Sequence, residues 1–272
     1  MSWRVIAEKE LRTLLGPRRS KALLGLVFVV FTFGGYLLPV ENPAPTTADY
    51  AVYMKTSASL LVPLVGLLLG YKTVVDERTS GRLTLLLSLP HGRRDTVLGK
   101  YLARVAVLAG TLTVGIGLGV ALVDYPFGSF EAGDAFAYLG LSLLHGATFL
   151  GIGVAISTAT ASNRAATAAA FGVFFLFVVV WAQLRGALVL LFDYLGLAEG
   201  GLPDWALFLY GAEPGMLYSR VVDAQFAGVT EGAYLGSEAP WFLGAGTATV
   251  LLVGWVLLPP TVGYLQFRRT DL

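Results

Sequence analysis

Six stretches of this 272-residue chain hold mostly apolar residues, and each is long enough to cross a lipid bilayer as a helix. Crossing a hydrocarbon core of about 30 Å takes roughly 20 residues at 1.5 Å each. Residues 23–39 contain no charged side chain, while Arg and Lys gather in a few short loops between the stretches. This segregation predicts an all-α integral membrane protein with six transmembrane helices, at about residues 21–39, 56–75, 101–123, 135–157, 165–183 and 241–264.

The composition agrees with this class and excludes several kinds of chemistry. Apolar residues make up 56% of the chain and charged residues 14%, with a mean hydropathy of +0.70, whereas about a quarter of the residues in soluble domains are charged. The chain has no cysteine, which excludes disulfides, thiol catalysis and zinc–thiolate sites. A net charge of only +1 gives no reason to expect a nucleic-acid partner.

The first 20 residues have the pattern of an amphipathic helix that lies on the membrane surface. Gly16 and Pro17 end it, and because a charged segment precedes the first apolar run and no small-residue cleavage site follows, we expect no cleavable signal peptide. One face is apolar and the other charged, with Trp3, Ile6, Ala7, Leu11, Leu14 and Leu15 set against Arg4, Glu8, Lys9 and Arg12.

The basic residues predict the orientation of the spans. Most of the 19 Lys and Arg residues lie before the first span, around the second-to-third connection, at Arg164 or at the C-terminus. The exceptions are Lys55, Arg185 and Arg220. Because basic residues near span ends stay on the cytoplasmic side, we expect both termini to be cytoplasmic in a multi-pass protein of the cytoplasmic membrane.

One long segment, residues 184–240, is then extracytoplasmic. Its first part, 184–197, is apolar enough for a helix. A seventh span there would place Arg268 and Arg269 on the outer side, against the charge rule. We therefore expect 184–197 to enter or lie on the outer leaflet as a re-entrant or interfacial helix.

The connection between the second and third spans, residues 76–100, is the most informative loop. Its apolar run is too short to cross a membrane and is bracketed by charge. The pattern predicts a short amphipathic helix, formed by Leu83, Leu86, Leu87 and Leu89, that ends near Pro90 and is followed by Arg93 and Arg94. Such a helix suits either a membrane surface with anionic lipid or a docking site for a soluble partner.

The same loop resembles the permease subunits of ABC-2 type transporters. The resemblance is carried by Glu77-Arg78, Gly81, Leu85-Leu86-Leu87, Ser88, Pro90, Arg93-Arg94 and Gly99-Lys100 after a second span. The N-terminal Lys9-Glu10-Leu11-Arg12 helix, the six spans and the long outer segment before the last span extend it over the whole chain. Among branches, the chain is most similar to the one that contains the permease of the nitrous-oxide-reductase maturation transporter.

This resemblance implies a single transmembrane domain over residues 1–272 that dimerises, with itself or a related chain, and binds a separate cytoplasmic ATPase. The loop 76–100 would be the coupling helix, and the N-terminal helix would lie beside it. ATP and Mg would be bound by the partner, with no cofactor in this chain. The implied docking positions are Glu77, Arg78, Gly81, Arg82, Pro90, Arg93 and Arg94.

No motif indicates catalysis by the chain itself. Between Gly92 and Lys100 the spacing is wrong for a phosphate-binding loop, and Tyr101 follows where Ser or Thr is required. Gly115 to Gly119, like Gly66 and Gly70, indicates close helix packing. The two histidines, His91 and His145, suggest neither a metal site nor a triad. A stripe of Ser142, His145 and Thr148 on the fourth span would either form interhelical hydrogen bonds or line a substrate path.

The resemblance therefore implies a permease subunit that moves a substrate, with export as the family's usual direction, using ATP hydrolysed by a partner. Expected partners are the ATPase, a second permease copy and membrane lipid. The alternative is a membrane anchor or assembly factor that recruits a soluble protein without transport, and an intramembrane enzyme comes third. Co-purification of an ATPase would separate the first two.

Overall fold

The computed structural model describes residues 2–83, 92–125, 128–197, 201–229 and 240–269. In this part of the chain, helices are joined by short turns and loops, and there is one isolated bridge between Thr46 and Ser129. Six helical stretches are long and apolar enough to cross a membrane. They are Ser20–Glu41, Thr47–Thr79, Arg93–Asp124, Ala132–Ala159, Asn163–Tyr194 and Ala245–Arg269. The predicted all-α class and the predicted number of spans are confirmed.

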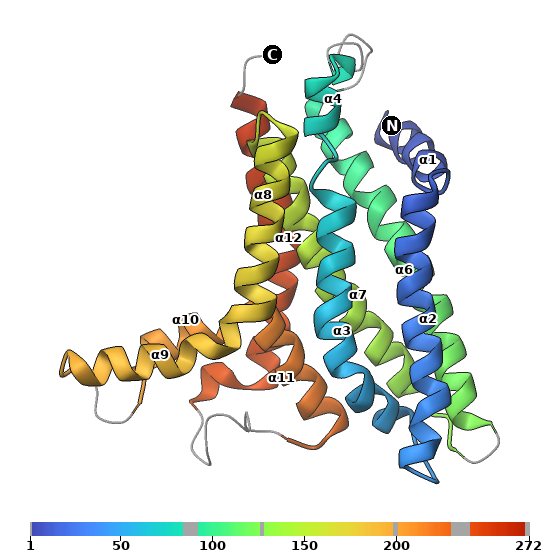
Figure 1. The fold of residues 1–272 in the computed structure, drawn as a ribbon, viewed down its shortest axis with the longest axis vertical. Helices are drawn as coiled ribbons and strands as arrows, with labels where there is room; N and C mark the ends of the chain where they lie inside the picture. Colours follow the sequence, from blue (N-terminus) through green and yellow to red (C-terminus); the bar gives the residue numbers. More distant parts are fainter. Residues whose placement is uncertain (1, 84–91, 126–127, 198–200, 230–239, 270–272) are drawn as a thin grey trace.

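The elements of the described residues are all helices (Figure 1). Their bounds are α1 Ser2–Leu14, α2 Arg18–Glu41, α3 Thr47–Gly70, α4 Val75–Thr79, α6 Arg93–Asp124, α7 Ala132–Ala159, α8 Asn163–Phe174, the π-helix η1 Phe175–Val180, α9 Trp181–Tyr194, α10 Asp204–Gly211, α11 Pro214–Phe226, the 3-10 helix η2 Trp241–Leu243 and α12 Ala245–Arg269.

Helix α7 is the centre of the bundle, packed against α3, α6, α11 and α12. Of the most apolar 18 residues of α7, 67% are buried, whereas the figure for the stretch that contains α8 and α9 is 11%. The exposed apolar surface of α8 and α9 would be unfavourable in water, but in a bilayer the lipid chains solvate it as well as another helix does. The exposed faces of α2, α8 and α9 are therefore surfaces for lipid or for another membrane helix.

Small residues let α3 and α7 approach each other closely. A Cβ added at Gly70 would lie 2.5 Å from the carbonyl oxygen of Leu150, and one at Gly66 would lie 2.7 Å from that of Gly146. The packing predicted from these glycines is confirmed. In α6, Gly115 and Gly119 likewise lie against α2, whereas Gly117 faces open space.

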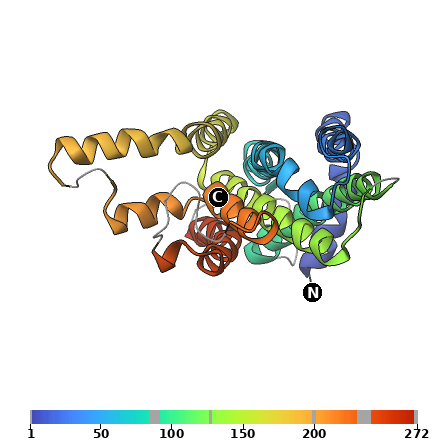
Figure 2. The same ribbon diagram turned by 90° about the horizontal axis from the view of Figure 1, so that it is seen from below.

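The fifth span differs from its prediction. A span at 165–183 followed by a separate helix was expected, but α8, η1 and α9 form one helical stretch from Asn163 to Tyr194. Since the run contains no proline and stays apolar, nothing in it ends the helix. Instead it bends: Figures 1 and 2 show α9 extending sideways from the bundle beyond α8, and the π-helix η1 lies at the turn.

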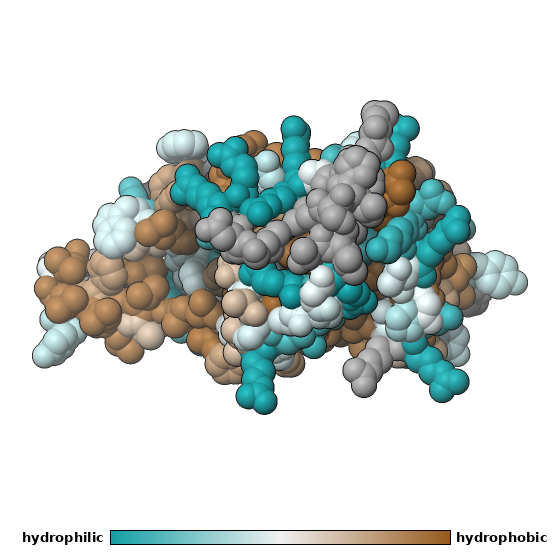
Figure 3. Space-filling model, turned by 90° about the horizontal axis from the view of Figure 1, so that it is seen from above, coloured by the Kyte–Doolittle hydropathy of each residue, from teal (hydrophilic) through white to brown (hydrophobic). Residues whose placement is uncertain are grey.

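The two ends of the bundle are different in character. Both termini lie at the same end as α4, and α9, α10 and α11 lie toward the other (Figure 1). Viewed from the end that carries the termini, hydrophilic side chains gather over the bundle, whereas the projecting arm is hydrophobic (Figure 3). We call the first the polar end.

The close contact between α3 and α7 leads to a prediction about stability. Gly70→Ala places a methyl group against the backbone of α7 and is expected to lower the free energy of unfolding by about 1–3 kcal/mol. Gly117→Ala adds the same atoms where space is open and should be neutral or slightly stabilising. Thermal unfolding in detergent compares the two variants, and equal melting temperatures would contradict the packing.

A candidate coupling site at the polar end

Four charged side chains form a buried cluster at the polar end, and they come from three helices. Lys100 of α6 donates to Glu10 of α1 and to Glu77 of α4, each at 2.8 Å. Arg104, one turn further along α6, pairs with the second oxygen of Glu10 at 2.8 Å. Lys100, Arg104 and Glu10 are all buried. We call these four residues the charge cluster.

Local sequence patterns bring the charge cluster together. Ile6 and Glu10 are four residues apart and share one face of α1, the face that packs on α6. That packing is close, because a Cβ added at Gly99 would lie 2.7 Å from the carbonyl oxygen of Trp3. Lys100 follows directly and therefore meets Glu10. Arg104 also donates to the carbonyl of Leu69, which adds the end of α3 to the assembly.

The charges in the cluster compensate one another. Burial alone would raise the pKa of Glu10, but the charges of Arg104 and Lys100 and their hydrogen bonds lower it below its usual value. Removing one partner from such a group leaves an uncompensated buried charge, which costs about 3–5 kcal/mol. The charge cluster thus holds α1, α4 and α6 in one fixed arrangement.

Two of the predicted docking arginines bind helix ends within the chain. Arg78 donates to the carbonyl oxygens of Thr160 and Thr158, at 2.8 and 3.2 Å, at the end of α7. Arg93 donates to those of Phe267 and Arg268, at 2.8 and 3.1 Å, at the end of α12. Both guanidinium groups also lie over the ring of Phe267. Cations at helix C-termini complement the helix dipole.

Helix α4 is fixed from its other side as well. The hydroxyl of Ser157 accepts hydrogen bonds from the backbone N–H groups of Val74 and Val75, at 2.8 and 3.0 Å. These bonds satisfy donors at the start of the short helix, which has no side-chain cap of its own. The first part of the 76–100 connection is therefore attached to α7, α6 and α1.

The remaining predicted docking residues differ in their placement. Gly81 follows α4 with φ of 73°, a left-handed conformation that ends the helix and that glycine adopts without strain. Arg82 and Arg94 are exposed. Pro90 lies outside the described residues, as do the leucines of the expected amphipathic helix except Leu83, which is buried.

The polar stripe on α7 is buried as a whole, since Ser142, His145 and Thr148 have no exposed surface. Ser142 lies 3.5 Å from the hydroxyl of Tyr218 on α11, whose ring stacks on His145 with centroids 4.4 Å apart. Thr148 donates to the Leu144 carbonyl of its own helix. Ser142 and His145 thus face α11, while the role of the stripe stays a prediction.

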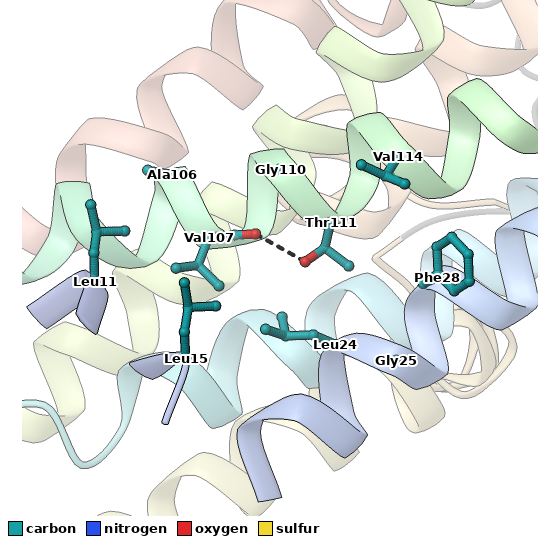
Figure 4. Close-up of a pocket in the computed structure, with 10 residues that line it drawn as sticks. All are labelled: Leu11, Leu15, Leu24, Gly25, Phe28, Ala106, Val107, Gly110, Thr111 and Val114. Atoms are coloured by element: carbon teal, nitrogen blue, oxygen red, sulfur yellow. Dashed lines mark hydrogen bonds between the residues drawn. The ribbon is translucent and has the colours of Figure 1, made fainter. Parts of the chain in front are cut away.

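An open groove of about 440 Å³ lies between α1, α2 and α6. Its lining is almost wholly apolar, and the hydroxyl of Thr111 bonds to the Val107 carbonyl of its own helix at 3.0 Å (Figure 4). With no charged side chain in its wall, this groove has little means of selecting a polar ligand. It is instead a surface that an acyl chain or another apolar helix would cover.

The sequence pointed to Lys100 as part of the family resemblance and counted it, with Arg104, among the basic residues that set orientation, but it gave neither residue a structural partner. It counted Glu10 as part of an interfacial helix. A signal for the charge cluster was present, because Glu10 lies on the apolar face of α1 and Lys100 and Arg104 lie one turn apart at the start of a span. What the sequence could not supply was the docking of α1 on α6.

These features define a multi-pass helical membrane subunit whose polar end gathers an amphipathic helix and a charged connection between two spans. Among the described residues, no group of three His, Asp or Glu side chains could hold a metal ion.

Comparison with known proteins gives the family. The family model described as "ABC-2 family transporter protein" matches residues 4–272. The chain is also 30% identical to the probable ABC transporter permease protein NosY of Stutzerimonas stutzeri over 280 residues, or 97% of each chain. It is 30% identical to the protein of the same name from Pseudomonas aeruginosa over 221 residues, 79% of this chain and 78% of the relative.

The chain therefore belongs to the ABC-2 family of transporters, as a permease subunit. Permeases of this family lack the ATPase domain, typically hold no cofactor and work as part of an ATP-driven transporter. The resemblance predicted from the sequence is confirmed.

The charge cluster leads to a prediction about α1. Lys100→Met keeps the length of the side chain but leaves Glu77 without its ion-pair partner and Glu10 with one cation in place of two. We expect the variant to lose about 3–5 kcal/mol of stability and α1 to detach from α6. Hydrogen exchange of the α1 amides measures this. Lys9→Met, on the exposed face of the same helix, is the matched control, and equally fast exchange in both variants would contradict the role of the cluster.

Proposed function

We propose that this permease exports a substrate across the cytoplasmic membrane and that a separate ATPase docks on the connection at residues 76–100. The observation that carries the proposal is the convergence of α1, α4 and the start of α6 on one charge cluster, directly beside that connection. Family membership supports the ATPase partner, since such a permease must take its energy from another subunit.

The charge cluster supports a mechanism in which docking is transmitted as rigid-body motion. An ATPase that pushes on the 76–100 connection also pushes on α4, which Glu77 ties to Lys100, and on α6, which continues from the connection. Glu10 extends the unit to α1 and hence to α2. Separating these helices would cost several kcal/mol, so moving them together is the easier response.

Arg78 and Arg93 would transmit the motion of the connection to two further helices. They attach the two ends of the connection to the C-terminal ends of α7 and α12. A displacement of the connection is then felt by the central helix of the bundle and by the last span. The exposed Arg82 and Arg94 remain to meet the partner, and their charge favours an acidic groove.

The orientation and the assembly complete the proposal. The basic residues at the polar end support a cytoplasmic location for both termini and for the connection at residues 76–100. Helix α9 would then lie on the outer leaflet. The exposed apolar faces of α2, α8 and α9 suit a second permease copy and lipid. In such a dimer the substrate path would lie between the two copies. The polar stripe of Ser142, His145 and Thr148 is buried within one chain and faces α11.

Charge reversal separates docking residues from structural ones. Arg82→Glu combined with Arg94→Glu is expected to weaken co-purification of the ATPase by about tenfold or more and to leave the melting temperature unchanged, because both side chains are exposed. Arg78→Glu should lower the melting temperature instead. Arg164→Glu, an exposed arginine at the start of α8, is the control. Full ATPase retention in the double variant would contradict docking here.

Orientation is tested with the cysteine-free background that the chain supplies. A Ser88→Cys variant should react with a membrane-impermeant maleimide only after the cytoplasmic side is opened. Labelling in intact cells would place the connection outside and remove any access for an ATPase. A correctly oriented chain that binds an ATPase but transports nothing would favour the anchor instead of the transporter.

A further inference from the structure

A smaller cavity has walls from α9 and α11, two helices that lie toward the end of the bundle opposite the termini (Figure 1). It measures about 110 Å³ and is bounded by α3, α7, η1, α9 and α11. Polar groups from three of these elements line it: Ser59, His145, Glu213 and Ser219. Two of its wall residues, Phe177 and Val178, belong to the π-helix, a kind of bulge that often marks functional sites.

Two of the polar groups in the cavity lack partners. Both ring nitrogens of His145 and the hydroxyl oxygen of Ser59 are buried. None of these three atoms has a hydrogen-bond partner in the described part of the chain. The contacts that hold the His145 ring in the cavity wall are with other rings: it stacks on Tyr218 and lies edge-on to Phe149. Buried polar atoms without partners are rare and costly, so a ligand that supplies hydrogen bonds would be stabilised here.

Glu213 supplies a buried negative charge to the same cavity. Its two carboxylate oxygens accept hydrogen bonds from the backbone of Gly215 and Met216, at 2.8 and 2.7 Å. Ionised, the group has about four acceptor positions, so two are left over. Burial raises its pKa to about 7, and the two backbone bonds only partly oppose this shift.

No ion pair of Glu213 occurs among the described residues. The charged groups on the surrounding elements interact with other residues or lie beyond the cavity. Lys55 of α3 pairs with Asp223 of α11, and Arg220 donates to the carbonyl oxygens of Leu243 and Gly211. Arg185 lies one turn beyond the cavity-lining Ala182 on α9, and its Nε has no partner in the described part of the chain.

We propose that this cavity binds a compact cation with N–H donors, that is, ammonium or a small primary ammonium group. A carboxylate, an imidazole nitrogen and two hydroxyl oxygens are all acceptors for such donors. The rings of Phe149 and Phe177 in the wall add surfaces that attract cations. An anion would meet the charge of Glu213, and a neutral ligand would leave that charge unpaired. The volume accommodates about three to four water-sized groups at roughly 30 Å³ each, which limits the ligand to a small one.

The site does not depend on the proposed function, because it can be measured without an ATPase. It gives the pH dependence a definite sign. Binding requires the carboxylate, and Glu213 becomes protonated as the pH falls through about 7. Affinity is therefore full above pH 7 and falls by about tenfold for each pH unit below it, while a primary amine stays protonated throughout.

The probe is radiolabelled methylammonium, measured by scintillation proximity on the full chain in nanodiscs at constant ionic strength. Saturable binding is expected, with competition by ammonium and none by tetramethylammonium, which has no N–H donor. His145→Phe keeps the ring stacking and removes the acceptors, and Ser59→Ala removes one hydroxyl. Each should weaken binding, His145→Phe by about tenfold or more, and Glu213→Gln should abolish the pH dependence.

The matched control is Thr148→Val, which removes a buried hydroxyl from the same helix but outside the cavity lining. It should bind as the unchanged protein does. Glu213 is the N-cap of α11 through its bonds to Gly215 and Met216. Because His145→Phe and Ser59→Ala leave this cap intact, they remain informative even where Glu213→Gln fails to fold. Absence of saturable binding, equal competition by tetramethylammonium, or unchanged affinity in His145→Phe would each overturn the proposal.

Discussion

The hydrocarbon interior of a bilayer offers no water to a backbone, and this constraint governs the whole molecule. It requires each span to close its own hydrogen bonds and removes the hydrophobic drive between helices, so contact has to come from close packing. Helices α3 and α7 meet that requirement with glycines at positions 66 and 70, which let one backbone approach the other. The central position of α7 follows from this contact and from its further contacts with α6, α11 and α12.

Charged side chains are then confined to the ends, and where they are buried there, they must pair. The charge cluster meets this condition with two acids and two bases from α1, α4 and α6. Arg78 and Arg93 meet it in another way, by binding the exposed carbonyls at the ends of α7 and α12. The polar end is thus held firmly where it adjoins the bundle, and of the four arginines predicted for docking, Arg82 and Arg94 are the exposed ones.

The sequence predicted the number of spans and their class because apolar length is a one-dimensional property. Span ends were less predictable, as at α3, which begins at Thr47 instead of near 56 because Thr46 and Asp49 form a capping box there. The continuation of the fifth span past 183 as one bent helical stretch was not predicted for the opposite reason, since no residue stops the helix. The family resemblance implied docking for Arg78 and Arg93. In the structure both side chains donate hydrogen bonds to the carbonyl ends of other helices, α7 and α12. Which charges meet across the fold depends on three-dimensional docking that spacing along a single helix does not encode.

The cavity near α11 shows the same constraint at work where it is not fully met. Within the described residues, His145 has no hydrogen-bond partner and Glu213 has no ion pair, and both face one small space although each is costly to bury. The surrounding structure holds them there: the indole N–H of Trp255 binds the carbonyl of Ala212, next to Glu213, and Tyr218 stacks on His145. Since the fold fixes both groups without satisfying them, their hydrogen-bonding capacity is available to a ligand. A cation that pairs with Glu213 would also bridge α11 to α3 and α7, and so add to the stability of the end of the bundle opposite the coupling connection.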